Sequence, residues 1–552
     1  MRFEKIDEVF SSVSFYNEVL NPKDVLLLDL CLIHERLFSG EEKSMSSFVR
    51  SCISEQIKED FMMDDFHREI DRISEEDIKN YAKYLICEFY VNDLLNNDQH
   101  NTIQLSDLAL SFLKVENNEA LLDFGSGYGA FLCRASECLN KTDTNSISLT
   151  GVETNSQSYA ISKIAFEILD VNGDIHQGDY LEEDLPDFDK GFVFPTINAR
   201  FTSGINSLCY PELFFQNNAS SFGWVYVDKM LHNLKDNGRI VALLPIKSLF
   251  SSSDEEYRRK LINDGLIEGI VELPSFVISM SSVKMAFVVL SKGNSSTKIV
   301  DASNMVIGER MRRYNVEMDL ERITKSYFSS DCFVVPKNDL LTRNNHTPSS
   351  ILAKPGEIEN GRLLGEIANV YSGSQYTINK FKEYISARAT ERRIISPSDI
   401  DNGMIEWDRL PYISGITKFD KYSIEKDDLI ITSKSSKIKI AVVDIEPEET
   451  VIATGGMLVV RPFSELDPTF LKIFLESAEG QKAIKSIQKG NTITTINAKD
   501  LQTIVVPVPD LDYQKRIAKK YNNQLTTLRA LREEANNIEN RLKNFYESEV
   551  ES

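Results

Sequence analysis

Short apolar runs alternate with helix-like segments between residues 116 and 292, and this alternation restricts the fold more than any other feature of the sequence. The runs are ALLDF (120–124), ISLTGVE (147–153), KGFVF (190–194), GRIVALLP (238–245), IEGIVELP (267–274) and MAFVVLSK (285–292). Strands that alternate with helices in this way predict an α/β fold with a largely parallel sheet and crossover helices.

The residues before this segment have a different pattern. Residues 1–115 are expected to form a helical N-terminal domain, since apolar residues recur every three or four positions at 24–37 and 76–95. The α/β domain itself is predicted to cover residues 116–345.

The C-terminal part of the chain is rich in short β runs. Examples are LIITS, KIAVVDI and TVIATGGMLVVRP, which predict a mixed α/β domain at residues 358–512. Residues 513–548 then predict one long helix, in which many apolar residues are three or four positions apart. From Leu528 onward this spacing is that of a coiled-coil seam.

The composition limits the class of protein. Of the 552 residues, 42% are hydrophobic and 26% are charged, as in ordinary soluble globular proteins. No stretch of about 18 apolar residues predicts a transmembrane helix, and the N-terminus lacks the apolar core of a signal peptide. Seven cysteines without a C-x-x-C pair and six scattered histidines predict no metal site. We therefore expect a cytoplasmic protein without a membrane partner.

The acidic charge is concentrated near the N-terminus. The net charge of −22 on its own argues against a nucleic-acid partner, because phosphate binding favours basic surfaces. However, residues 1–200 contain 17 of the 62 basic side chains and 38 of the 84 acidic ones, so the rest of the chain is almost neutral. The average charge therefore leaves room for a DNA-binding surface after residue 200.

The segment LLDFGSGYGAFL carries the strongest chemical signal. An apolar strand ends in Asp123, and then Gly125, Gly127 and Gly129 precede a helix. Glycines let the backbone turn tightly and approach a ligand without Cβ clashes. The next strand ends at Glu153, where a carboxylate can accept hydrogen bonds from both hydroxyls of a ribose. The turn and this acid together predict a site for a nucleoside-containing cofactor.

Two cofactor classes are compatible with this turn. The spacing Gly-x-Gly-x-x-Ala fits the dinucleotide fingerprint. Asp123, however, stands two residues before the first glycine, where it can meet the amino-acid end of S-adenosyl-L-methionine. The pattern Asp-x-Gly-x-Gly-x-Gly also resembles the first motif of Rossmann-like methyltransferases, so we expect S-adenosyl-L-methionine as the cofactor. That resemblance implies that Asp179, which follows a later short strand, bonds the adenine amine of the cofactor.

From about residue 100 to 292, the chain resembles the methylation subunit of type I restriction–modification systems. The resemblance rests on residues 234–277, with their Leu-Pro, Leu-Phe, Arg-x-x-Leu and Val-x-Leu-Pro elements, and on a closing strand at 283–293. That family consists of adenine-N6 DNA methyltransferases. The resemblance therefore implies a Rossmann-like, sequence-specific DNA methyltransferase of the restriction–modification type.

The sequence departs from this family where methyl transfer would occur. The family carries Asn-Pro-Pro-Phe after the fourth strand, and its amide and ring hold a base flipped out of the DNA helix. That place is taken here by FPTI (194–197) or, four residues later, by NARF (198–201). In the second alignment, Asn198 and Phe201 are the candidate catalytic residues. The alternative is a catalytically degenerate DNA-binding subunit with the methyltransferase fold that acts with an active partner.

Residues 361–548 resemble the specificity subunit of the same systems. The segments GRLLGEIANVYSGSQY, DDLIITSKSSKIKIAVVD and GNTITTINAKDLQTIVVPVPDL carry this resemblance. It implies one target-recognition domain that reads double-stranded DNA, followed by a spacer helix. Residues with side chains that can hold phosphates or read base edges are Arg388, Arg392, Arg393, Lys434, Lys437, Lys439, Lys489 and Asn491.

One target-recognition domain reads one half-site, and two arrangements are open. The chain can form a homodimer through its helix and read a palindromic bipartite site. It can also act alone, with the helix folded back on its own methyltransferase domain. Other restriction–modification subunits are further expected partners, because the sequence contains neither a nuclease motif nor a Walker loop.

Overall fold

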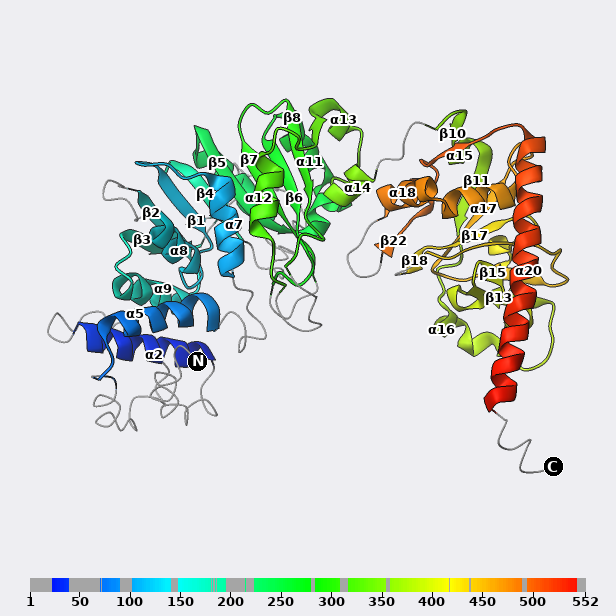
Figure 1. Cartoon of the computed structure of the whole chain (residues 1–552), viewed down its shortest axis with the longest axis horizontal. Helices are drawn as coiled ribbons and strands as arrows, with labels where there is room; N and C mark the ends of the chain where they lie inside the picture. The colour runs from blue at the N-terminus through cyan, green and yellow to red at the C-terminus, as the bar shows by residue number, and fades with distance from the viewer. Residues whose placement is uncertain are drawn as a thin grey trace. The chain divides into compact units, whose positions relative to one another are not determined.

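The computed structural model places the chain in two compact units, Met1–Ile351 and Leu352–Ser552, which we describe separately (Figure 1). It describes residues 22–38, 70, 72–89, 102–139, 147–179, 181, 184, 186–194, 214, 223–278, 283–307, 316–353, 358–415, 417–435, 438–488 and 494–543.

The first unit is built around a nine-stranded sheet in the order β3-β2-β1-β4-β5-β7-β6-β8-β9 (Figure 1). Its strands are β1 (Ala120–Phe124), β2 (Ser148–Glu153), β3 (Gly173–Gln177), β4 (Phe188–Val193), β5 (Leu234–Pro245), β6 (Ile267–Glu272), β7 (Met285–Ser291), β8 (Ser296–Asp301) and β9 (Val334–Pro336). Strands β1 to β5 pair in parallel, whereas β7 is antiparallel to both β5 and β6. The order β3-β2-β1-β4-β5 is that of a Rossmann sheet, and the predicted α/β fold is confirmed.

Helices cover both faces of this sheet. They are α2 (Pro22–Leu37), α5 (Glu75–Tyr84), α7 (Ile103–Leu113), α8 (Ala130–Leu139), α9 (Ser156–Ile168), α10 (Trp224–Asn233), α11 (Glu255–Asn263), α12 (Leu320–Phe328), α13 (Lys337–Leu341) and α14 (Pro348–Leu352). Successive side chains of a strand point to opposite faces, and β5 accordingly contributes Val241 to one hydrophobic core and Ile240 to the other. Helices α2 and α5 share the first core with α8 and α9, so they belong to the same compact unit.

The second unit contains two four-stranded sheets, in the orders β11-β21-β17-β19 and β12-β16-β13-β20. Three two-stranded sheets accompany them: β10-β23, β14-β15 and β18-β22. The strands are β10 (Gly361–Leu363), β11 (Ala368–Ser372), β12 (Ile385–Ser386), β13 (Arg392–Ile395), β14 (Ile400–Asp401), β15 (Met404–Ile405), β16 (Tyr412–Ile413), β17 (Leu429–Thr432), β18 (Lys434–Ser435), β19 (Ile440–Val442), β20 (Thr450–Ala453), β21 (Met457–Pro462), β22 (Thr494–Thr495) and β23 (Val505–Pro507). The apolar run TVIATGGMLVVRP is thus divided between β20 and β21, which lie in different sheets. Gly456, at a φ of +98°, lies in the turn between them.

One long helix closes the second unit. The helices of this unit are α15 (Leu364–Ile367), α16 (Ile378–Phe381), α17 (Pro468–Glu476), α18 (Ala478–Ile487), α19 (Ala498–Leu501) and α20 (Leu511–Lys543). Figure 1 shows α20 as a single uninterrupted helix, as the sequence predicts. Among the described residues, no helix combines the length and the apolar character that crossing a bilayer requires.

Candidate cofactor and DNA sites

The glycine-rich turn links the carboxyl end of β1 to the start of α8. The amide groups of Gly125 and Ser126 both donate to the carbonyl oxygen of Val152 in β2, at 3.1 and 2.9 Å. Gly125, Gly127 and Gly129 have φ values of +96°, +54° and +77°. Because L side chains rarely adopt such values, the turn favours glycine at all three positions.

Gly127 and Gly129 have different surroundings. A Cβ atom on Gly129 would lie 3.0 Å from the Phe166 ring and 3.2 Å from the Cβ atom of Ser162, so this glycine lets α9 pack closely. A Cβ atom on Gly127 would have no neighbour within 4 Å. The open space beside Gly127 is therefore the place where a ligand can approach the bare backbone.

Glu153, the last residue of β2, is fixed beside this space. Its side chain is buried, and one carboxylate oxygen accepts a hydrogen bond from the Gly127 amide at 2.8 Å. The other oxygen accepts from the Asn155 amide at 2.7 Å. Each oxygen of an ionised carboxylate can accept a further bond, so Glu153 is placed to receive hydroxyl groups of a ligand.

Asp123 lies beneath the turn, near the end of β1. It is only 2% exposed, and no hydrogen bond reaches its carboxyl group within the described part of the chain. Burial, with a smaller contribution from the charge of Glu153, raises the pKa of Asp123 well above its ordinary value. A cationic ligand group would supply the missing counter-charge and favour the carboxylate form.

Asp179 follows β3 at the same edge of the sheet. It is exposed, and its carboxylate accepts a hydrogen bond from the Leu181 amide at 2.9 Å. Tyr226 of α10 lies close enough to Asp179 to feel its charge. Burial and, to a smaller extent, this charge raise the pKa of the Tyr226 phenol. The Tyr226 ring makes an edge contact with Phe124, with 6.0 Å between the ring centroids. Sequence reasoning missed Tyr226, because an aromatic residue on an apolar helix is typical of an ordinary core.

These residues fit S-adenosyl-L-methionine. Asp123 offers a buried carboxyl group for the ammonium of this cofactor, and Glu153 offers acceptors for its ribose hydroxyls. The open space beside Gly127 leaves room for the cofactor to lie against the backbone. Parallel strands end at the same edge of a sheet, so β1, β2 and β3 bring together residues that are far apart in the sequence.

The predicted target-base residues Asn198 and Phe201 lie outside the described residues. The same holds for Pro195, Thr196 and Ile197 of the first alignment. The structure describes Phe194, which directly follows β4 and packs, half-buried, against the first hydrophobic core.

Three of the predicted DNA-contacting cations hold the second unit together. Arg392 forms a two-point ion pair with Asp420, with N–O distances of 2.9 and 3.0 Å. Arg393 donates to the carbonyl oxygens of Trp407 and Leu410, which lie 14 and 17 residues away in the sequence. The Lys439 ammonium donates to the carbonyl oxygens of Pro397 and Ile400 at 3.1 and 2.8 Å.

The remaining predicted DNA contacts divide into two groups. Arg388 and Lys434 have exposed side chains and take part in no ion pair within the described residues. Lys437, Lys489 and Asn491 lie outside the described residues.

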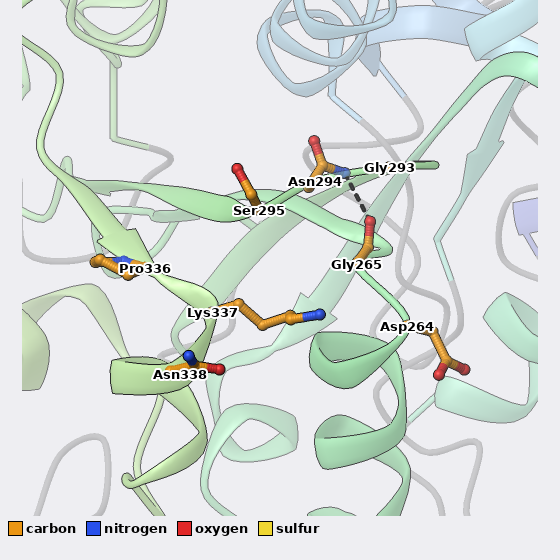
Figure 2. Close-up of a pocket in the computed structure, with 8 residues that line it drawn as sticks. All are labelled: Asp264, Gly265, Gly293, Asn294, Ser295, Pro336, Lys337 and Asn338. Carbon is orange, nitrogen blue, oxygen red and sulfur yellow. Dashed lines mark hydrogen bonds between the residues drawn. The ribbon is translucent and has the colours of Figure 1, made fainter.

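A second hollow, of about 460 Å³, lies at the other edge of the large sheet (Figure 2). It is lined by Asp264, Gly265, Gly293, Asn294, Ser295, Pro336, Lys337 and Asn338. The side-chain amide of Asn294 donates to the Gly265 carbonyl oxygen at 3.1 Å in the wall of this hollow. Because the hollow precedes β6 and β8, whereas the glycine turn follows β1, it is not part of the candidate cofactor site.

Two family models match consecutive parts of the chain. Residues 89–347 match the model described as N-6 DNA Methylase. Residues 358–540 match the model described as Type I restriction modification DNA specificity domain.

Individual relatives are distant. The type I restriction enzyme EcoBI specificity subunit of Escherichia coli is 24% identical over 157 residues, which are 28% of this chain and 33% of that subunit. The type I restriction–modification methyltransferase subunit of Streptococcus thermophilus has 19% identity and a TM-score of 0.45, over 50% of this chain and 64% of that one. A putative class I S-adenosylmethionine-dependent methyltransferase of Listeria monocytogenes has 15% identity and a TM-score of 0.41, over 57% and 93% of the two chains. The chain thus spans a third of the curated relative.

Proposed function

Because this chain joins an N-6 DNA methylase domain to a type I restriction–modification DNA specificity domain, we propose that it methylates the N6 amine of adenine within a specific DNA sequence. The observation that carries the proposal is the pair of carboxyl groups of Asp123 and Glu153 around the open side of Gly127, inside the region that matches the methylase family.

The cofactor site would use four kinds of contact. Asp123 would bind the ammonium of S-adenosyl-L-methionine, and Glu153 would accept hydrogen bonds from its ribose. The backbone of Gly125, Gly127 and Gly129 would let the cofactor approach closely. Asp179 would accept from the adenine amine of the cofactor. The cofactor, when bound, supplies an electrophilic methyl group.

The target adenine would be held by Asn198 and Phe201. Oxygen acceptors at Asn198 would receive hydrogen bonds from the N6 amine and orient its lone pair, and the Phe201 ring would stack on the flipped base. This assignment follows the alignment NARF (198–201), which keeps the amide and the ring at the spacing that the family uses.

The second unit would select the DNA sequence. Arg388 and Lys434, with their exposed cationic side chains, would contact the double helix, as would Lys437, Lys489 and Asn491. Arg392, Arg393 and Lys439 would contribute less than the sequence predicts, because their polar atoms already bind groups of the same unit.

Partners and location follow from this activity. The substrate would be double-stranded DNA, and the protein would act on it in the cytoplasm. Other restriction–modification subunits or a second copy of the chain would join it, because one specificity domain reads one half-site. The intact carboxyl groups of the cofactor site favour an active enzyme over a catalytically degenerate DNA-binding subunit.

Methyl transfer from labelled S-adenosyl-L-methionine to genomic DNA that lacks this modification tests the proposal. We expect N6-methyladenine at one recurrent sequence, which sequencing of the modified bases would identify. Asn198→Ala should abolish transfer and leave cofactor binding intact, whereas the matched variant Thr196→Ala should retain transfer. Absence of transfer by protein that binds the cofactor would contradict the proposal and favour the degenerate subunit.

A further inference from the structure

The second unit has a hollow of about 610 Å³ beside the start of α20. One wall is the first part of α20, which runs next to α17 (Figure 1). The other wall is the connection from β21 to α17. The lining residues are Asp427, Pro462, Phe463, Ser464, Leu466, Asp467, Pro468, Thr469, Leu511, Lys515, Ala518, Lys519, Asn522 and Asn523. A hollow of this size suits a small molecule, since ligand sites in proteins usually have volumes of about 300–1,000 Å³.

Gln514 of α20 holds the two walls of this hollow together. Its side chain is fully buried, and its amide donates to the carbonyl oxygens of Glu465 and Pro509 at 3.0 and 2.7 Å. Its side-chain oxygen accepts a hydrogen bond from the Asp467 amide at 2.9 Å. Because the bonds to Glu465 and Asp467 connect α20 to the opposite wall, the hollow is formed before a ligand enters, as most small-molecule sites are.

The hollow has an apolar floor and an aromatic ring at its rim. Leu466 and Ala518 line it and are only 3% and 6% exposed, so they form the floor. The Phe463 side chain is 47% exposed, although burial of such a ring is favourable. It takes part in no ring contact within the part of the chain that the structure describes. An exposed aromatic ring can bind a nucleobase by stacking.

Two lysines of α20 bring positive charge to the same hollow. Lys515 and Lys519 are four residues apart, so they lie on the same side of the helix. Like charges at this spacing destabilise a helix, and neither lysine forms an ion pair among the described residues. An anion with more than one negative charge, bound between them, would relieve this repulsion.

The other polar groups of the lining suit a sugar and the edge of a base. Asp427 is exposed, and its carboxylate can accept hydrogen bonds from sugar hydroxyls. The side-chain amides of Asn522 and Asn523 supply donors and acceptors. Asp467, in contrast, accepts from the Phe470 amide at 2.9 Å and caps α17. The lining therefore offers contacts for a base, a sugar and phosphates.

We propose that this hollow binds a nucleoside di- or triphosphate, with its base on the Phe463 ring and its phosphates between Lys515 and Lys519. The site is separate from the candidate cofactor site, because it lies within the second unit. None of its residues belongs to the predicted DNA contacts. The proposal therefore goes beyond methyl transfer and can be tested without it.

Titration calorimetry of the full chain with ATP tests the proposal. Excess S-adenosyl-L-methionine in the solution keeps ATP from binding at the candidate cofactor site. Glu153→Gln, which alters only that site, should leave the affinity for ATP unchanged. We expect one ATP per chain. Adenosine and tripolyphosphate should each bind more weakly, because adenosine lacks the phosphates and tripolyphosphate lacks the base.

Substitutions in the hollow separate the contacts of the base from those of the phosphates. Phe463→Ala should weaken ATP binding about tenfold and leave the affinity for tripolyphosphate unchanged, because only the base stacks on the ring. Lys515→Ala and Lys519→Ala should each weaken the binding of both ligands about fivefold. Lys520→Ala removes an exposed cation of the same helix outside the hollow, so it is the matched control. Thermal unfolding checks that each variant is folded, as expected for exposed side chains.

Three results would overturn the proposal. The first is no binding of ATP at millimolar concentration. The second is ATP binding that Phe463→Ala and both lysine variants leave unchanged, since ATP would then bind elsewhere. The third is tripolyphosphate or a short DNA duplex that binds through the two lysines as tightly as ATP, which would indicate a site for phosphate groups alone.

Discussion

Replacement of Gly127 by alanine tests whether the open space beside the turn is the cofactor site. At a φ of +54°, alanine would have to adopt a left-handed backbone, which lowers the free energy of unfolding by about 1 kcal/mol. No steric cost adds to this, because the new methyl group meets nothing within 4 Å. The methyl group would, however, fill the space that the ligand needs. We therefore expect affinity for S-adenosyl-L-methionine to fall at least about tenfold, or ~1.4 kcal/mol.

Two matched variants separate backbone strain from loss of ligand space. Gly293 also has a positive φ, +86°, and open surroundings, but it lines the hollow at the opposite edge of the sheet. Gly293→Ala should cost about as much stability as Gly127→Ala and leave cofactor affinity unchanged. Gly129→Ala adds overpacking against Phe166 and Ser162 to the strain, and should cost roughly 2–3 kcal/mol.

The chain provides a convenient probe for these measurements. Its two tryptophans, Trp224 and Trp407, lie one in each compact unit. In a Trp407→Phe background, the fluorescence of the fully buried Trp224 reports denaturant unfolding of the first unit alone. Titration calorimetry gives the cofactor affinity. Wild-type affinity in Gly127→Ala, or an equal loss in Gly293→Ala, would refute the reasoning.

Three further predictions concern charges. The raised pKa of Asp123 means that the folded state holds a proton which the unfolded state releases. The free energy of unfolding therefore falls as pH rises from the pKa of the unfolded state to that of the folded state. Asp123→Asn should remove this fall in denaturation measurements at several pH values, and should weaken cofactor binding. Burial and the charge of Arg258 lower the pKa of His346 to about 4. The free energy of unfolding of the first unit should therefore fall as pH falls from 6.5 towards 4, and it should fall less in His346→Gln when both are unfolded by denaturant over this range. In the second unit, Arg388→Ala should lower DNA affinity in a gel-shift assay without loss of stability. Arg393→Ala should instead lower the stability of the unit, because the Leu410 carbonyl oxygen loses its arginine donor and the Trp407 carbonyl oxygen keeps only the Leu410 amide.

The strands of the large sheet were predictable because buried strands appear in the sequence as short runs of apolar residues. ALLDF was predicted as a strand at 120–124, and β1 has these bounds. The long helix α20 was predictable for the same reason, since its apolar spacing is visible within a few turns. Both features depend on residues that are neighbours in the sequence.

Contacts between distant residues could not be read in this way. Arg388 and Arg393 belong to one basic cluster in the sequence, yet only Arg393 meets carbonyl oxygens 14 and 17 residues away. The bond between Gly127 and Glu153 spans 26 residues and depends on the pairing of β1 with β2. Likewise, nothing in the sequence around Tyr226 indicates that it lies near Asp179.

The division of labour among the cations of the second unit has a consequence for its evolution. Arg392, Arg393 and Lys439 brace the unit from within, whereas Arg388 and Lys434 extend from its surface. Mutations that alter the exposed group leave the internal braces in place. Under the proposed function, a lineage could therefore change its recognition sequence by small changes at the surface, without first rebuilding the scaffold that carries it.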